Sequence, residues 1–204
     1  MKAAVLTAPE HLDVVEMDTP PCPTDGALLE TRACSICSTD VHMYRHGHRD
    51  LVLPRILGHE VSGRIVEVGV DAVGVKKGER IQLAPGVACG QCRACMRGHP
   101  NMCEHMKIFG FHLDGGFEQY ISIPAQALDA GCAIELPPHL SYEWAALAEP
   151  LACCINAQDA TRVGAEDIVA IIGAGPVGCL NAMLAKGRGA DRIILIDTDP
   201  SRLE

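Results

Sequence analysis

The strongest constraint in this sequence is a short segment that carries four cysteines in the pattern C-x2-C-x2-C-x7-C. Gly90, Gly98 and Pro100 lie between them and favour tight turns. Four thiolates gathered by short turns can surround Zn²⁺ as a tetrahedron, with Zn–S distances of about 2.3 Å. An iron–sulfur cluster and ordinary buried thiols are the alternatives. A closed four-thiolate zinc site has no open position, so we expect it to hold a loop in place. The four predicted ligands are Cys89, Cys92, Cys95 and Cys103.

The chain holds eleven cysteines in all, and disulfide bonds are the other explanation for so many. The four clustered cysteines are too close together for several unstrained bridges, and a reducing cytosol would not maintain them. The opening MKAAVLTAPEHLDVV lacks the layout of a signal peptide, since charge and proline interrupt it early. No apolar run approaches the roughly 20 residues of a membrane span. We therefore expect a cytoplasmic protein that binds metal and does not enter a membrane.

The charge balance excludes another class of partner. Lysine and arginine number 17 against 26 acidic residues, which gives a formal net charge of -9. A nucleic-acid-binding surface needs a basic face to meet phosphates, so we expect no nucleic acid partner. The length of 204 residues suffices for one complete domain and part of a second.

Residues 1–140 have the pattern of a β-rich domain, because short apolar stretches alternate with glycine and proline. In 61–69, Gly63 and Gly69 indicate a bent strand in a barrel-like sheet. Residues 76–80 predict a turn. The expected strands lie in 3–7, 27–33, 61–69, 79–87 and 117–125.

Residues 141–204 have a different character. Ser141 is a helix-capping residue before the alanine-rich segment 141–160, and Pro150 predicts an interruption of that helix. An apolar strand at 168–175, a helix over 176–186 and a second apolar strand at 192–197 follow. Continuous apolar runs are typical of buried parallel strands, so this order predicts a β-α-β unit.

A second group of metal-ligand types comprises Cys37, His59 and Glu60. One thiolate, one imidazole and one carboxylate leave a fourth position on zinc for water or a substrate oxygen, and the metal could then polarise an alcohol. Thr39 and His42 follow closely and could pass the alcohol proton to solvent. Spacing alone leaves open that His59 is a satisfied polar residue and Glu60 an ion-pair partner.

A third motif is the glycine pattern G-x-G-x-x-G, which follows one apolar strand and opens a helix. Such glycines let the backbone approach a pyrophosphate at the helix N-terminus. Asp197 ends the next apolar strand, where a carboxylate would accept hydrogen bonds from a ribose 2′-hydroxyl, so NAD is favoured over NADP. A purely structural glycine turn is the alternative. The predicted cofactor-binding residues of the loop are Gly173, Gly175, Pro176, Val177 and Gly178.

Together these motifs resemble the zinc-dependent medium-chain alcohol dehydrogenases, in particular the sorbitol and threonine dehydrogenase branch. The resemblance covers essentially the whole chain. It is carried by CSICSTDVH at 34–42, GHEVSGRIVEVG at 58–69, the four-cysteine segment at 89–103, DGGFEQY at 114–120, AEPLACCINA at 148–157 and GAGPVG at 173–178.

The resemblance implies a mixed α/β protein: a GroES-like β-rich catalytic domain at 1–140, then linker helices and the first β-α-β unit of a Rossmann domain at 141–204. It implies catalytic-zinc ligation by the Cys37 group and structural zinc in the four-cysteine loop. The implied roles of other residues are proton relay for Thr39 and His42, ribose contact for Asp197 and Arg202, and a place beside the catalytic zinc for Glu149, as a ligand or through water. Cys34 falls outside the family's ligand position.

The implied activity is oxidation of a secondary alcohol, a polyol or a threonine-like substrate, with hydride transfer to NAD. Two strands and one helix are fewer than a Rossmann domain needs, so we expect a C-terminally truncated chain that is inactive alone. A non-catalytic zinc-binding fragment is therefore the alternative function. Family members are commonly dimers or tetramers, which implies a homo-oligomer for the full-length form.

Overall fold

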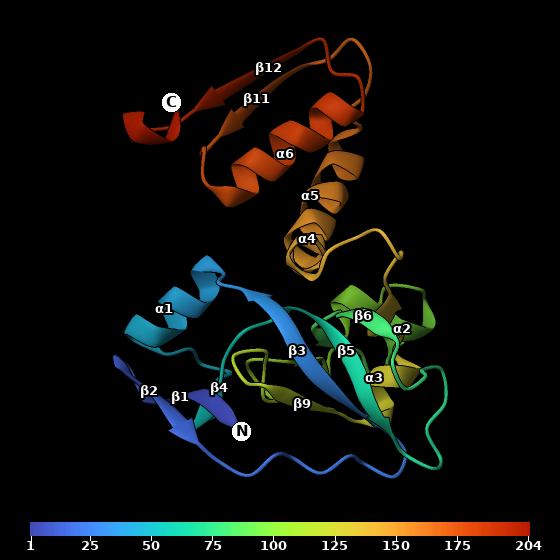
Figure 1. The fold of residues 1–204 in the computed structure, drawn as a ribbon. Coiled ribbons are helices and arrows are strands. Elements are labelled where there is room, and N and C mark those ends of the chain that lie inside the picture. Colours follow the sequence, from blue (N-terminus) through green and yellow to red (C-terminus); the bar gives the residue numbers. More distant parts are fainter. The chain divides into compact units, whose positions relative to one another are not determined.

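A five-stranded antiparallel sheet organises the first of the two units of the computed structural model, which describes residues 1–204. This unit spans Met1–Leu147, and the sheet order is β10-β6-β5-β3-β9. Figure 1 labels β3, β5, β6 and β9 of this sheet. Along the strands, alternate side chains are apolar and point to the same face of the sheet. They form a fully buried core on that face, which includes Leu29, Ile65, Ile81 and Phe109. The strands are β3 (Ala27–Ser35), β5 (Glu60–Val68), β6 (Arg80–Leu83), β9 (Tyr120–Ile123) and β10 (Ala133–Glu135).

The pairing of β3 with β5 is irregular at Gly63, a position that the sequence singled out. The pairing of β3 with β5 shifts register between Thr31 and Ala33, opposite Gly63. A Cβ atom at Gly63 would lie 2.2 Å from the carbonyl oxygen of Glu30, so only glycine permits this close approach of the two strands.

Smaller elements complete the first unit. A three-stranded sheet has the order β2-β1-β4, and β7 pairs with β8. A second buried cluster, which includes Leu6, Met43, Leu57 and Phe111, lies beneath helix α1. The remaining elements are β1 (Lys2–Ala8), β2 (His11–Glu16), β4 (Arg55–Ile56), β7 (Gly86–Val87), β8 (Lys107–Ile108), α1 (Ser38–His46), α2 (Arg93–Met96), η1 (Pro100–Met102), α3 (Ala125–Asp129) and α4 (Tyr142–Ala146).

Several sequence predictions need correction in detail. The strand expected at 79–87 is two strands, β6 and β7, with Pro85 between them, because proline has no N–H for a ladder. Ser141 caps α4 as expected, since its hydroxyl accepts a hydrogen bond from the Trp144 amide at 3.3 Å. The helix break, however, lies at Leu147. Pro150 lies in the first turn of α5, where its missing N–H removes no helical hydrogen bond.

The second unit, Ala148–Glu204, contains the predicted β-α-β arrangement. Strands β11 (Ile168–Ile172) and β12 (Arg192–Ile196) pair in parallel, and α6 (Pro176–Gly187) connects them. Helix α5 (Ala148–Thr161) packs along α6, where the Gln158 side-chain amide donates to the backbone oxygen of Asn181 at 2.8 Å. The short helix η2 (Pro200–Arg202) follows β12. The division of the chain leaves α4 with the first unit and α5 with the second. No helix in the structure is both long and apolar enough to cross a membrane.

Candidate metal sites and dinucleotide-binding unit

The four-cysteine segment folds into a single sulfur cluster. All four Sγ atoms lie within 4.8 Å of one another, and the Sγ of Cys92 is 3.5 Å from that of Cys95 and 3.9 Å from that of Cys103. Gly90 and Gly98 have positive φ and supply the turns. Four sulfurs at about 2.3 Å from a tetrahedral Zn²⁺ are about 3.8 Å apart, so this donor set fits zinc.

Backbone amides donate hydrogen bonds to the sulfurs of this cluster. The amide of Cys92 donates to Cys89 Sγ at 3.3 Å, and the amide of Cys89 donates to Cys103 Sγ at 3.3 Å. Backbone N–H donors, from Cys95 first, lower the pKa of Cys92 to about 6. Desolvation and the neighbouring cysteines raise the pKa of Cys95 to about 12. The cluster therefore holds thiolate charge, and a further thiolate becomes favourable only beside a cation.

Strand pairing assembles the second group of metal-ligand residues. Ser35 at the end of β3 pairs with Glu60 at the start of β5, so Cys37 follows β3 directly beside His59 and Glu60. One ligand atom from each of these three residues lies within 4.8 Å of the others. His59 and Glu60 are buried. One thiol, one imidazole and one carboxylate match the donors of a zinc site with an open position.

Asp40 holds this second group together, although sequence reasoning did not single it out. Its Oδ2 accepts from the Cys37 amide at 2.9 Å, and its Oδ1 accepts from the Gly58 amide at 3.2 Å. The same Oδ1 lies 3.4 Å from Nδ1 of His59. One buried carboxylate thus orients two predicted ligands. An available signal was its place three residues after Cys37 at a helix start, which is typical of a capping residue.

The pKa of His59 reflects this environment. Burial lowers it, but the carboxylate of Asp40 and the side chain of Cys37 outweigh burial and raise the pKa to about 9. Without a metal, the imidazole is therefore protonated at neutral pH. Metal binding requires the neutral imidazole, so it would release this proton.

Cys34 lies near the second group but outside it. Its Sγ packs so closely that a Cβ at Gly58 would be 2.9 Å away and one at Gly116 would be 2.7 Å away. Burial first, and then the charge of Asp40, raise the pKa of Cys34 to about 12. A neutral packed thiol is a poor metal ligand, which agrees with the prediction that Cys37 is the ligand of the C-x2-C pair.

The predicted relay residues lie on helix α1, an element that the sequence analysis did not foresee. The thiol of Cys37 donates to Oγ1 of Thr39 at 3.5 Å. His42 follows one turn later and is exposed. The buried ring of Phe111, also missed by sequence reasoning, has its centroid 5.9 Å from that of His59.

Glu149 belongs to the second unit. It lies in the first turn of α5, where its Oε1 accepts a hydrogen bond from the Cys153 thiol at 3.8 Å. Its role beside the catalytic metal stays a prediction.

The glycine motif forms the predicted loop between β11 and α6. Gly173 has φ +106°, which favours glycine, and Gly175 caps α6 with Pro176 and Val177 in its first turn. A Cβ at Gly178 would lie 1.8 Å from the carbonyl oxygen of Gly173, so no larger residue fits. The loop and helix therefore present free backbone amides at a helix N-terminus, an arrangement that suits a phosphate.

Asp197 closes the other side of this loop. Its Oδ2 accepts from the Ala174 amide at 2.7 Å, and its Oδ1 accepts from the Asp199 amide at 2.9 Å. Arg202 lies 3.7 Å from Oδ2. The backbone amides of Asp199 and Ala174, followed by Arg202, lower the pKa of Asp197, so its carboxylate is charged. Lone pairs remain on both oxygens for further hydrogen bonds.

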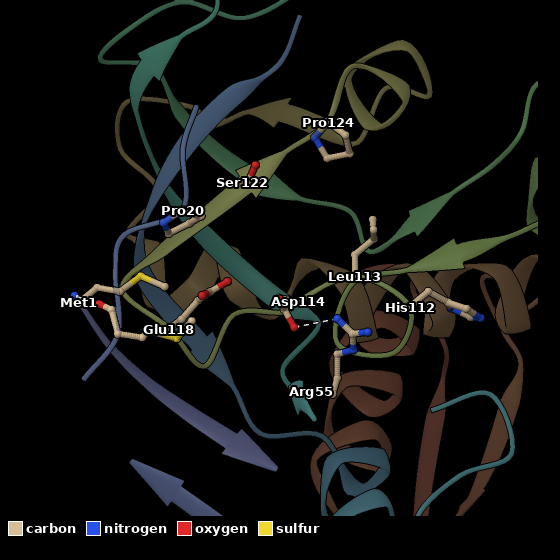
Figure 2. A pocket seen from close by; sticks show the side chains of 10 residues that line it. Met1, Pro20, Arg55, His112, Leu113, Asp114, Glu118, Ser122 and Pro124 are labelled. Atoms are coloured by element: carbon tan, nitrogen blue, oxygen red, sulfur yellow. Dashed lines mark hydrogen bonds and ion pairs between the residues drawn. The ribbon is translucent and has the colours of Figure 1, made fainter. Parts of the chain in front are cut away.

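The first unit also contains a pocket of about 310 Å³ (Figure 2). Arg55 and Asp114 form an ion pair of 2.8 Å at its edge. Burial, and secondly the charge of Asp114, raise the pKa of Glu118 to about 8. No residue of either metal-ligand group lines this pocket. It is therefore a separate feature of the β-rich unit.

The fold and its sites define a class of protein: a β-rich unit with two groups of metal-ligand residues, followed by a β-α-β unit with a glycine loop. The family model of the alcohol dehydrogenase GroES-like domain matches residues 23–131, and the chain belongs to this family. The mixed α/β fold with a GroES-like domain is thus confirmed.

Known relatives agree with this assignment. The chain is 37% identical to sorbitol dehydrogenase of Bacillus subtilis over 208 residues, across all of this chain and 58% of that protein. It is 37% identical to L-threonine 3-dehydrogenase of Pyrococcus furiosus, with 98% of this chain and 57% of that one covered. A zinc-binding dehydrogenase of Sinorhizobium meliloti, solved with NADP, superposes with a TM-score of 0.90 at 35% identity, across 98% of this chain and 57% of that one. The chain thus spans somewhat more than half the length of these relatives.

Proposed function

We propose that this chain is the zinc-binding part, with the start of the dinucleotide-binding part, of an oxidoreductase that oxidises a secondary alcohol with NAD. The observation that carries the proposal is the gathering of Cys37, His59 and Glu60 within 4.8 Å, with donors for three positions on one metal. We place the zinc-binding part at about residues 1–140 and the cofactor-binding part at about 141–204. The relatives that act on sorbitol and threonine favour a polyol or a threonine-like substrate.

Each proposed ligand group has a separate task. A zinc ion on the Cys37 group, when bound, would polarise the alcohol oxygen and ease loss of its proton. The four-cysteine cluster offers sulfur on every side, so we assign it a structural zinc. Asp40 contacts the Cys37 amide and His59 Nδ1 and so orients both residues, as carboxylates that neighbour metal ligands do in other metal sites.

Oxidation of the alcohol removes one proton and one hydride from it. When bound, NAD would supply the acceptor for the hydride, and the product would be a carbonyl compound. Thr39, whose hydroxyl neighbours Cys37 Sγ, accepts the alcohol proton and hands on its own. His42 on the next turn of α1 is exposed, so its imidazole can take up the proton and release it to water.

The charged carboxylate of Asp197 supports NAD as the cofactor. It would accept hydrogen bonds from the ribose hydroxyls and repel a 2′-phosphate. The glycine loop and α6 would bind the pyrophosphate. The related Sinorhizobium meliloti structure contains NADP, so a direct comparison of the two cofactors tests this part of the proposal.

We also infer the setting of the protein. None of the eleven cysteines is in a disulfide, which suits a reducing compartment and supports a cytoplasmic location. We expect a homo-oligomer for the full-length form, a small-molecule alcohol as its substrate, and no nucleic acid or membrane partner.

Zinc content, NAD binding and turnover of the purified chain test the function together. Zinc is counted by plasma mass spectrometry after desalting, NAD binding is followed by calorimetry, and turnover is followed as NADH absorbance with sorbitol, threonine or butanediol. The Cys37→Ser variant should lose one of two zincs, together with any NADH formation that the native chain shows. The Cys34→Ser variant is the matched control and should keep both zincs.

The outcomes separate the two functions. NADH formation that depends on Cys37 supports the oxidoreductase. Two bound zincs without NAD binding or turnover favour the alternative, a zinc-binding chain without catalysis of its own. A Cys37→Ser variant that retains both zincs and turnover would overturn the proposed catalytic site.

A further inference from the structure

Two exposed histidines on helix α1 lie next to each other outside both metal-ligand groups. His42 and His46 are four residues apart, so they share one face of the helix. Their ring centroids are 5.0 Å apart and their planes are inclined by 59°, which is not a parallel stack. Neither imidazole forms a hydrogen bond or an ion pair with another residue, so their nitrogens are available to a ligand.

The spacing of the two rings matches a shared metal ion. Zinc binds imidazole nitrogen at about 2.0–2.1 Å, and that nitrogen lies about 1.1 Å from the ring centre. Two imidazoles on one tetrahedral ion therefore have centroids about 5.2 Å apart. The observed centroid separation of 5.0 Å is close to this value. Pairs of histidines four residues apart on a helix bind zinc in the same way in other proteins.

We propose that His42 and His46 form a surface site for a divalent transition metal such as zinc or nickel, with water on the remaining positions. Imidazole donors suit these ions, whereas magnesium and calcium require oxygen ligands. Two neutral donors hold a metal less tightly than a thiolate-containing group. The surface site therefore fills only after the two other groups are occupied.

A consequence of this site rests on the relay proposed above. A metal bound to His42 occupies the nitrogen that would otherwise carry the proton to solvent. Excess zinc should then inhibit turnover, and the His46→Asn variant should relieve that inhibition. The metal site itself does not depend on turnover, so a failure of the relay and a failure of the site give different results.

Calorimetry on the zinc-loaded chain tests the site. The protein is saturated with zinc, desalted so that only tightly held zinc remains, and titrated with zinc chloride. We expect one further equivalent to bind. His42→Asn and His46→Asn should each weaken this event at least tenfold, and magnesium chloride should give no binding. His48→Asn is the matched control: this exposed histidine lies just beyond α1, its ring packs against Phe111, and its loss should leave the event unchanged.

Two further measurements show whether each variant is folded and which histidines bind the metal. Circular dichroism establishes that each variant is folded, which is expected because both side chains are exposed. Nuclear magnetic resonance of the imidazole signals should show that zinc perturbs His42 and His46 together. The proposal is overturned by the absence of a further equivalent, or by an equivalent that binds as tightly in both variants.

Discussion

Replacement of Asp40 by asparagine probes the architecture of the proposed catalytic metal site. The buried carboxylate accepts hydrogen bonds from the amides of Cys37 and Gly58 and lies 3.4 Å from His59. Asparagine keeps the shape but removes the negative charge. Loss of such an outer partner typically weakens metal binding 10–100-fold, which corresponds to about 1.4–2.7 kcal/mol.

The pH of this measurement matters because Asp40 also raises the pKa of His59 to about 9. Near pH 7 the proton competes with the metal in the native chain, and this competition is weaker in the variant. The loss of zinc affinity in Asp40→Asn is therefore expected most clearly at higher pH. It should grow as the pH rises from 7 to 9, where the imidazole of the native chain loses its proton.

The assay is competition for zinc with a chromophoric chelator at pH 9. The four-cysteine cluster serves as an internal reference and should keep its affinity in Asp40→Asn. Asp13→Asn, an exposed position on β2, is the control and should change neither site. Equal weakening of both zincs would indicate general destabilisation and refute the reasoning, as would full affinity of both zincs at pH 9.

Three further outcomes are expected. Burial raises the pKa of Glu118 from 4.5 to about 8, so the native chain loses stability as the pH rises from about 4.5 to 8. The melting temperature of Glu118→Gln should therefore rise relative to that of the native chain across this window. Parallel pH profiles of the two melting temperatures would contradict this prediction. Gly178→Ala should destabilise the second unit by more than about 2 kcal/mol in urea unfolding because its Cβ meets a backbone carbonyl at 1.8 Å, whereas Gly175→Ala has open space and should fold normally. Asp197→Ser should reduce the preference for NAD over NADP at least tenfold in binding assays, and an unchanged ratio would exclude Asp197 from the ribose site.

Patterns among residues that are close in the sequence predict part of the fold. The parallel β-α-β unit follows from two apolar runs around a glycine loop, and the observed bounds of β11, α6 and β12 agree with that pattern. The close approach of β3 and β5 at Gly63 depends on a glycine within a strand pattern. These features depend on residues that are neighbours in the sequence, so periodicity and turn residues suffice to predict them.

Features that depend on distant contacts were not predictable in this way. Helix α1 is short, and its start is stabilised by Asp40, whose other partners Gly58 and His59 lie well beyond it in the sequence. Ligand types and the family resemblance identified Cys37 and His59, but only the pairing of β3 with β5 explains why they meet. The prediction of a helix break at Pro150 is wrong, and the break lies at Leu147. Proline is tolerated in the first turn of a helix, and whether Pro150 lies there depends on where α5 begins.

The most direct test of the central claim is zinc K-edge X-ray absorption on the zinc-loaded chain, together with a zinc count. The account predicts two zincs per chain, one bound by four sulfurs and one bound by a single sulfur with nitrogen and oxygen neighbours. In Cys37→Ser the mixed-ligand zinc should disappear and the all-sulfur zinc should remain. A single zinc with sulfur neighbours alone in the native chain would contradict the account.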